Sequence, residues 1–151
     1  MRVHKSIETM SKIWRHGRGH VAVVWNDKTL IWGGEGEQKA SDGTVLCHYG
    51  DKGEWVRIRP SGDGPTQQYG RHAEVINDKM YIMQAPLRDS GGPTTIYLYA
   101  LDLNNWQWTK NVPEGLLPLS DTKEFSSWHH RGKIYYFGGQ CGYDDGIVSG
   151  D

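Results

Sequence analysis

The chain has 151 residues, of which 17 are basic and 18 acidic, and a formal net charge of −1 at pH 7. This balance, without a basic stripe or an acidic tail, argues against a nucleic-acid-binding protein. No apolar run approaches the roughly 20 residues that cross a bilayer, which argues against a membrane protein. Twenty glycines, seven tryptophans and eight tyrosines favour many short strands with tight turns.

Residues 1–17 contain no apolar run of the kind that a secretory signal requires. We interpret them as an N-terminal extension or a first connecting strand. Cys47 and Cys141 are too few for a disulfide framework and lack the spacing of metal ligands. Reduced thiols are typical of the cell interior, so we expect a protein of the cytoplasm, the nucleus or both.

The first predicted hairpin joins two apolar runs, residues 19–25 and 29–34, through a polar turn that ends in Lys28. Its second strand closes on Gly33 and Gly34, and glycine suits a position of positive φ or close backbone approach. A second predicted hairpin, residues 46–58, carries Trp55, and a Gly/Pro connector follows it.

The same order of elements recurs twice. Residues 71–85 repeat the first hairpin, residues 96–109 repeat the second with Trp108 in the place of Trp55, and residues 127–139 begin a third unit. The third unit closes on a second glycine doublet, Gly138 and Gly139. The first glycine position of the pattern falls at 33, 84 and 138, which gives steps of 51 and 54 residues. We therefore expect three copies of a β-hairpin repeat of about 50 residues.

These repeats resemble the kelch family over roughly residues 18–143, through the glycine doublets, the downstream aromatic and the tryptophan that follows it. The resemblance implies an all-β partial β-propeller built from blades of four antiparallel strands, with the first strand of each blade innermost. Residues 125–139, 19–23 and 32–34 are most similar to kelch-domain substrate receptors of cullin-RING ubiquitin ligases.

We predict a first blade at residues 18–65, a second at 66–118 and an incomplete third at 119–151. A propeller closes with about four to eight blades, so two and a half to three blades leave the ring open. The chain is then an incomplete product, a short form that pairs with itself, or an open three-blade unit. Unpaired strand edges favour self-association in each case.

Candidate partner-binding residues precede the first strand of each hairpin, where the loops of a kelch propeller line the mouth of the channel. Arginine beside aromatic side chains at such a mouth suits a carboxylate or an acidic peptide. The candidates are Arg15, Arg18, Tyr69, Arg71, Ser126, Ser127 and Trp128. His20 and His72 belong to the same region, and both they and Arg71 have a structural alternative: the histidines bond neighbouring blades and Arg71 is a solvated charge.

Other features have simpler interpretations. Tryptophan and tyrosine at matching places indicate packing between blades, at Trp25, Trp32, Trp55, Tyr81, Trp108 and Tyr136. His129 and His130 point to opposite faces of a strand, which argues against a shared metal ion. Residues 84–93 form an insertion that is either a recognition loop or tolerated length. We expect neither an enzyme nor a cofactor, because nothing matches the copper or iron sites of catalytic kelch proteins.

The resemblance implies a protein-binding module that recognises substrates for a cullin-RING ubiquitin ligase. In that family a C-terminal peptide of the client docks in the channel, and a helical box after the propeller recruits the ligase subunits. This sequence ends before such a box, and it carries Glu124 and Gln140 where such receptors have basic and aromatic pocket residues. The alternative is a kelch scaffold that binds actin, a transcription regulator or a chromatin protein, with no link to ubiquitin.

Overall fold

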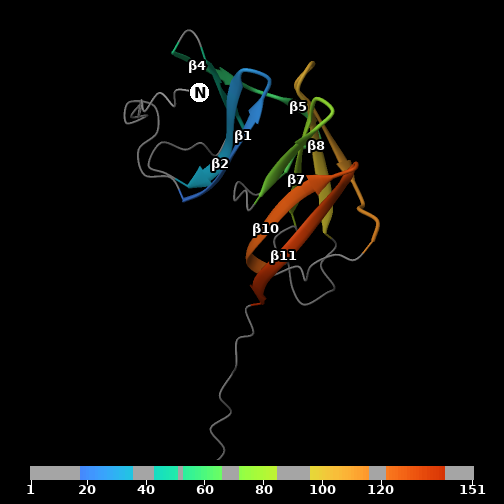
Figure 1. The fold of residues 1–151 in the computed structure, drawn as a ribbon. Coiled ribbons are helices and arrows are strands. Elements are labelled where there is room, and N and C mark those ends of the chain that lie inside the picture. The colour runs from blue at the N-terminus through green and yellow to red at the C-terminus, as the bar shows by residue number, and fades with distance from the viewer. Residues whose placement is uncertain are drawn as a thin grey trace, which may run out of the picture.

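The computed structural model describes residues 18–35, 43–50, 53–65, 72–84, 96–115 and 122–141. These residues form eleven strands in three sheets, which confirms the all-β fold (Figure 1). Within these ranges, no helix is long and apolar enough to cross a membrane. The insertion between hairpins and residues 1–17 lie outside the described residues, apart from Gln84 at the end of a strand.

The first sheet is a meander of four antiparallel strands. They are β1 (Arg18–Trp25), β2 (Lys28–Glu35), β3 (Val45–Tyr49) and β4 (Glu54–Ile58). β1 and β2 are joined by a two-residue turn, and Asn26 in that turn has a φ of 55°. Asparagine tolerates positive φ better than most residues, so the polar turn seen in the sequence fixes the register of the hairpin.

The second sheet repeats this meander and adds one strand. Its meander consists of β6 (Ala73–Ile76), β7 (Lys79–Gln84), β8 (Tyr97–Asp102) and β9 (Gln107–Asn111). The short strand β5 (Ser61–Gly62) pairs with β9 in parallel. β5 falls inside the range 18–65 that the sequence assigns to the first blade, yet it belongs to the second sheet, because the connector forms its hydrogen bonds there.

The third sheet contains a single described hairpin, β10 (Thr122–His130) and β11 (Lys133–Cys141). Its turn residues Arg131 and Gly132 have φ values of 48° and 71°, as a type I′ hairpin turn requires. The second sheet turns in the same way at Asn77 and Asp78. All three hairpins therefore turn at the same point of the repeat, directly before the lysine that the sequence pattern identifies.

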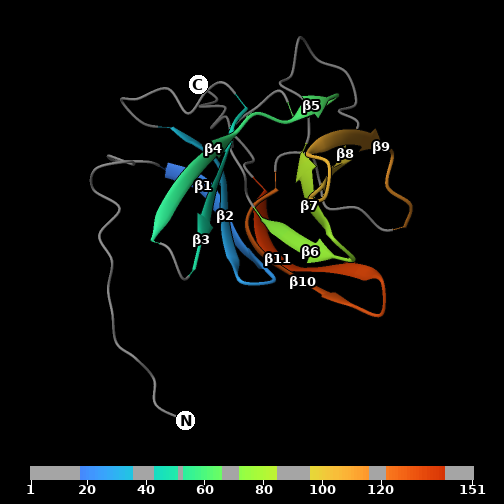
Figure 2. The same ribbon diagram turned by 90° about the horizontal axis from the view of Figure 1, so that it is seen from above.

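The first strands of the three sheets lie beside one another, β1 next to β6 and β6 next to β10 (Figure 2). Trp25 at the end of β1 donates its Nε1 proton to Asp78 in the turn after β6, at 2.7 Å. Ser127 of β10 donates to Glu74 of β6. These three inner strands therefore run in the same direction, which is the arrangement expected of consecutive propeller blades.

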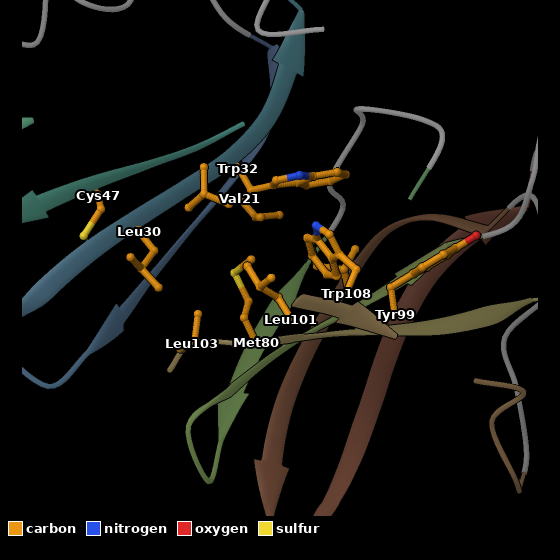
Figure 3. Close-up of a cluster of buried hydrophobic side chains, with 11 residues drawn as sticks. Val21, Leu30, Trp32, Cys47, Met80, Tyr99, Leu101, Leu103 and Trp108 are labelled. Atoms are coloured by element: carbon orange, nitrogen blue, oxygen red, sulfur yellow. The ribbon is translucent and has the colours of Figure 1, made fainter. Parts of the chain in front are cut away.

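Each sheet has a forward face, which points toward the next sheet, and a backward face, which points toward the previous one. Cross-strand partners share a face, so the register assigns every strand residue to one of the two. On the first sheet the forward face carries Val21, Leu30 and Trp32. On the second sheet the backward face carries Met80 and Trp108. These two faces form the core between the sheets (Figure 3).

Packing in this core is carried by large side chains. Leu30 and Met80 have no exposed surface, and Trp32 retains 1%. Trp32 and Trp108 meet edge to face with ring centroids 6.0 Å apart. This contact is the packing between blades that matching tryptophans predict. Cys47 is a free thiol in the same core, and burial raises the pKa of that thiol.

Candidate functional site

The starts of the inner strands form the first candidate surface. Arg18 is the first residue of β1 and pairs with Glu35, while Lys123 near the start of β10 pairs with Gln140. Arg18 and Lys123 stand the same number of residues before their hairpin turns, so they are equivalent positions of the repeat. Because the inner strands run in the same direction, both positions lie at the same end of the sheets. Lys123 is not among the partner-binding residues predicted from the sequence, although counting residues back from the hairpin turn identifies its position.

Of the predicted partner-binding residues, Arg15, Tyr69 and Arg71 lie outside the described residues. Ser126, Ser127 and Trp128 lie inside β10 and not before it, which corrects their predicted position. β10 begins four residues earlier, at Thr122, because it pairs with β11 up to Cys141.

The strand alternation separates these three residues. Ser126 and Trp128 are on the forward face of the third hairpin, whereas Ser127 is on its backward face, toward β6. Trp128 is 47% exposed and stacks on Tyr135 across the hairpin, with ring centroids 5.7 Å apart and planes 13° from parallel. The predicted triplet therefore contributes to two different surfaces.

Ser127 takes part in a polar contact between the second and third sheets. Its Oγ donates to Glu74 Oε1 at 2.8 Å, and His129 Nδ1 lies 3.2 Å from Glu74 Oε2. The Glu74 side chain is 17% exposed. The Glu74 carboxylate is half-buried and accepts from two donors on the neighbouring sheet. If the sheets moved apart, its oxygens would lose these donors, and water reaches them poorly. The two contacts therefore hold the second and third sheets in a fixed relative position.

This cluster holds a serine, a histidine and a carboxylate but is not arranged for nucleophilic catalysis. In such a site the histidine stands between the nucleophile and the carboxylate and accepts the hydroxyl proton. Here Ser127 and His129 both contact Glu74. Among the residues that the structure describes, no group of three His, Cys, Asp or Glu side chains fits a metal ion. The chemistry of the cluster is that of a clamp between blades.

Aromatic contacts continue this clamp. The rings of His72 and Phe125 lie 4.8 Å apart, and Phe125 meets Tyr136 edge to face at 5.3 Å. Burial lowers the pKa of His72, although the Glu74 carboxylate acts in the opposite direction. The net lowering favours the neutral imidazole. Burial, with a further contribution from Glu74, raises the pKa of Tyr136 to about 12. His72 therefore takes the structural role that the sequence left open, between the second and third sheets.

Glu74 was not predicted as a site residue. It stands on the forward face of β6, where the equivalent position of β1 holds the apolar Val23. A carboxylate among otherwise apolar positions of an inner strand was the signal available in the sequence.

The repeat residues predicted from the pattern occupy equivalent places. Gly33, Gly34 and Gly138 have φ values of 75°, 100° and 80°. Gly139 closes the same doublet in β11. Trp55 pairs with His48, and Trp108 pairs with Leu101, which puts both tryptophans on the backward face of their sheets.

Comparison with known proteins identifies the family to which this architecture belongs. Residues 19–149 match the family model described as the KLHDC2/KLHL20/DRC7 kelch-repeats domain. Human kelch domain-containing protein 10 is 30% identical over 128 residues, which cover 78% of this chain and 27% of that protein. Mouse kelch domain-containing protein 2 is 26% identical over 133 residues, which cover 80% of this chain and 32% of that protein.

Another kelch-containing relative matches a shorter part of this chain. The Rab9 effector protein with kelch motifs from Xenopus laevis is 28% identical over 89 residues, covering 56% of this chain and 24% of that protein. The chain thus spans between about a quarter and a third of the curated relatives that it matches.

Proposed function

This chain belongs to the kelch-repeat family, and from that premise we propose that it recognises client proteins for a cullin-RING ubiquitin ligase. The kelch domain is a protein-binding module. The ligase assignment rests on the likeness of residues 19–23, 32–34 and 125–139 to such receptors. Client recognition involves no catalytic step by this chain, and Ser127 and His129 both contact Glu74 instead of each other.

The alignment of the three inner strands carries the proposal. Because β1, β6 and β10 run in the same direction, their first residues lie at one end of the sheets. Arg18 is the first residue of β1 and Lys123 is the second residue of β10, and in the sequence Arg71 stands two residues before β6. Basic side chains that gather at one end of a rigid scaffold would suit a carboxylate, because Arg binds both carboxylate oxygens at once.

We infer that the ligand is a short client segment that ends in a free carboxylate or carries acidic side chains. The subunits that transfer ubiquitin would be recruited through a region outside this sequence. We also propose that the protein acts in the cytoplasm or the nucleus. The buried free thiol of Cys47 supports a reducing compartment.

A second candidate function is a kelch scaffold for a folded partner such as actin, a transcription regulator or a chromatin protein. One relative favours it, because that protein is by name a Rab9 effector with kelch motifs. A folded partner would not depend on a free C-terminal carboxylate, and this difference separates the two functions in one experiment.

The test is a screen of the purified chain against displayed C-terminal peptides, followed by fluorescence anisotropy on the best binders. We expect amidation of the peptide C-terminus to weaken binding about tenfold or more, because it removes the charge that the basic residues recognise. Arg71→Glu is expected to weaken binding to at least the same degree. Arg131→Glu is the matched control, since Arg131 is exposed in the turn at the other end of β10.

Equal binding of free and amidated peptides would contradict carboxylate recognition. Equal losses from Arg71→Glu and Arg131→Glu would show that net charge alone attracts the peptide. Binding of folded actin or of a chromatin protein without any peptide binder would support the second candidate.

A further inference from the structure

Trp106 adopts a backbone conformation that bulky side chains rarely tolerate. It is the last residue of the loop between β8 and β9, and its φ is 58°. The equivalent residue of the first sheet is Gly53, the last residue of the loop between β3 and β4, with a φ of 60°. Both loops begin with the same backbone hydrogen bond to the turn after the inner strand, donated by Gly50 in one loop and by Leu103 in the other. The position therefore requires a positive φ, which glycine adopts freely and tryptophan adopts only with strain.

The side chain of Trp106 is what distinguishes it from its glycine equivalent. Strained residues persist only where the surrounding structure holds them, and they cluster at sites with a function. Trp106 is half-buried, and its ring stands at 87° to the ring of Trp25, with the ring centroids 6.4 Å apart. Rings at this angle meet edge to face, so they do not cover each other as stacked rings do. A tryptophan that keeps part of its ring in contact with solvent, at a cost in strain, is suited to bind a ligand.

The aromatic rings at this end of the first and second sheets attract a cation. The Lys28 ammonium group lies 4.5 Å from the centre of the Trp25 ring and 5.6 Å from the centre of the Tyr49 ring. A positive charge within about 6 Å of a ring centre is attracted by the negative face of the ring. Among the residues that the structure describes, no cationic side chain lies over Trp106. The Trp106 ring therefore offers the same chemistry to a cation from outside the chain.

A carboxylate is held beside these rings. Asp78 is exposed, and its Oδ1 accepts the Nε1 proton of Trp25 at 2.7 Å. Its backbone oxygen accepts from Leu103 at 2.9 Å, at the start of the loop that ends in Trp106. Both contacts tie the turn after β6 to the two tryptophans, so the Asp78 carboxylate lies at the margin of the aromatic pair.

Two lysines near Asp78 are directed elsewhere in the described structure. Lys28 forms an ion pair with Asp27, with its Nζ 3.8 Å from Oδ1. Lys79 follows Asp78 in the chain but pairs with Ile76, which places it on the forward face of the second sheet, away from the first sheet. Asp78 therefore adds a negative charge beside the rings. A guanidinium group stacks flat on an aromatic ring and donates to a carboxylate from its edge, so this combination favours arginine over lysine.

We propose that Trp106 and Asp78 form a docking site for an arginine side chain of a partner protein. The guanidinium group stacks on the Trp106 ring, and its N–H groups donate to the Asp78 carboxylate. The site lies at the hairpin turns, at the opposite end of the sheets from the basic residues of the proposed client site. It goes beyond client recognition and does not depend on it, because the two ends bind ligands of opposite charge.

An NMR titration of the full chain tests the site, because the indole N–H group of each tryptophan gives its own resonance. The probe is a short peptide of alternating glycine and arginine, acetylated and amidated so that it offers no carboxylate to the other end of the sheets. We expect the Trp106 resonance to shift as the peptide is added and the resonance of the buried Trp108 to stay in place. Lysine in place of arginine should weaken binding, and glutamate should abolish it.

Trp106→Gly separates binding from folding, because it restores the residue of the equivalent loop and relieves the strain. We expect the affinity for the arginine peptide, followed through the Trp25 resonance, to fall about tenfold or more. The urea midpoint should stay the same or rise, as happens when a residue kept for binding is replaced by one that suits the backbone. Binding of peptides with a free C-terminal carboxylate should not change.

Asp78→Asn tests the carboxylate, because it removes the charge and keeps an oxygen that accepts from Trp25. We expect it to weaken binding of the arginine peptide about fivefold or more. Glu114→Gln is the matched control, since Glu114 is exposed and follows β9 at the far end of that strand. A urea midpoint lowered by Trp106→Gly would show that Trp106 serves packing alone and would overturn the proposal. A Trp106 resonance unmoved by the arginine peptide, or equal losses from Asp78→Asn and Glu114→Gln, would equally overturn it.

Discussion

Trp108→Ala is expected to destabilise the chain by about 3–5 kcal/mol, the usual cost of truncating a large buried aromatic side chain. Trp108 is 5% exposed and packs edge to face on Trp32 of the first sheet. Its removal opens a cavity between two sheets that share one core, so the loss affects the docking of the blades and the second sheet alike. Urea unfolding at a fixed protein concentration measures the change in the free energy of unfolding.

Trp108→Phe is the matched variant, because it keeps an aromatic ring at the contact with Trp32. We expect it to cost about half as much as Trp108→Ala. A cost below about 1 kcal/mol for Trp108→Ala would mean that Trp108 is not part of a core between the sheets. The assignment of equivalent blades would then be wrong at its best-packed point.

Gly62→Ala is expected to destabilise the chain by about 2–4 kcal/mol, more than the usual effect of adding one methyl group. A Cβ atom at Gly62 would lie 2.4 Å from the backbone oxygen of Trp108, and the φ of Gly62 is 87°. The methyl group therefore clashes with backbone that cannot rotate away, and positive φ adds strain. β5 would have to separate from β9, which thermal unfolding would show as a lower melting temperature.

Gly43→Ala separates the clash from the strain. Gly43 has a similar φ of 73°, but a Cβ atom there would meet nothing within 4 Å. We expect its replacement to cost about 1 kcal/mol, the conformational cost alone. Equal losses at both positions would show that β5 does not pack against β9 and that the connector is free of the second sheet.

The repeat was predictable because its signals are local. A two-residue polar turn, a following lysine and a glycine doublet each constrain a few neighbouring residues, and Asn26 and Gly33 adopt the positive φ values that such signals require. The tryptophans were predictable for a related reason. A large ring at the same place in each unit has room only between stacked sheets, as the contact between Trp32 and Trp108 shows.

The features that the sequence did not reveal depend on contacts between distant segments. β10 begins at Thr122, before the apolar run that marks the strand, because pairing with β11 extends it. β5 belongs to the second sheet because Ser61 donates a backbone hydrogen bond to Trp106, 45 residues away in the sequence. Glu74 binds Ser127 and His129 across a junction that no local pattern encodes. Tertiary contacts override local preference at these positions.

Client recognition at the starts of the inner strands is the central claim, and a pull-down of the tagged chain from its own cells, quantified by mass spectrometry, tests it most directly. We expect a short list of client proteins. Arg71→Glu should remove the clients, whereas Arg131→Glu should retain them. Recovery of only chaperones and further copies of the chain, or of the same partners with both variants, would contradict client recognition at this end of the propeller.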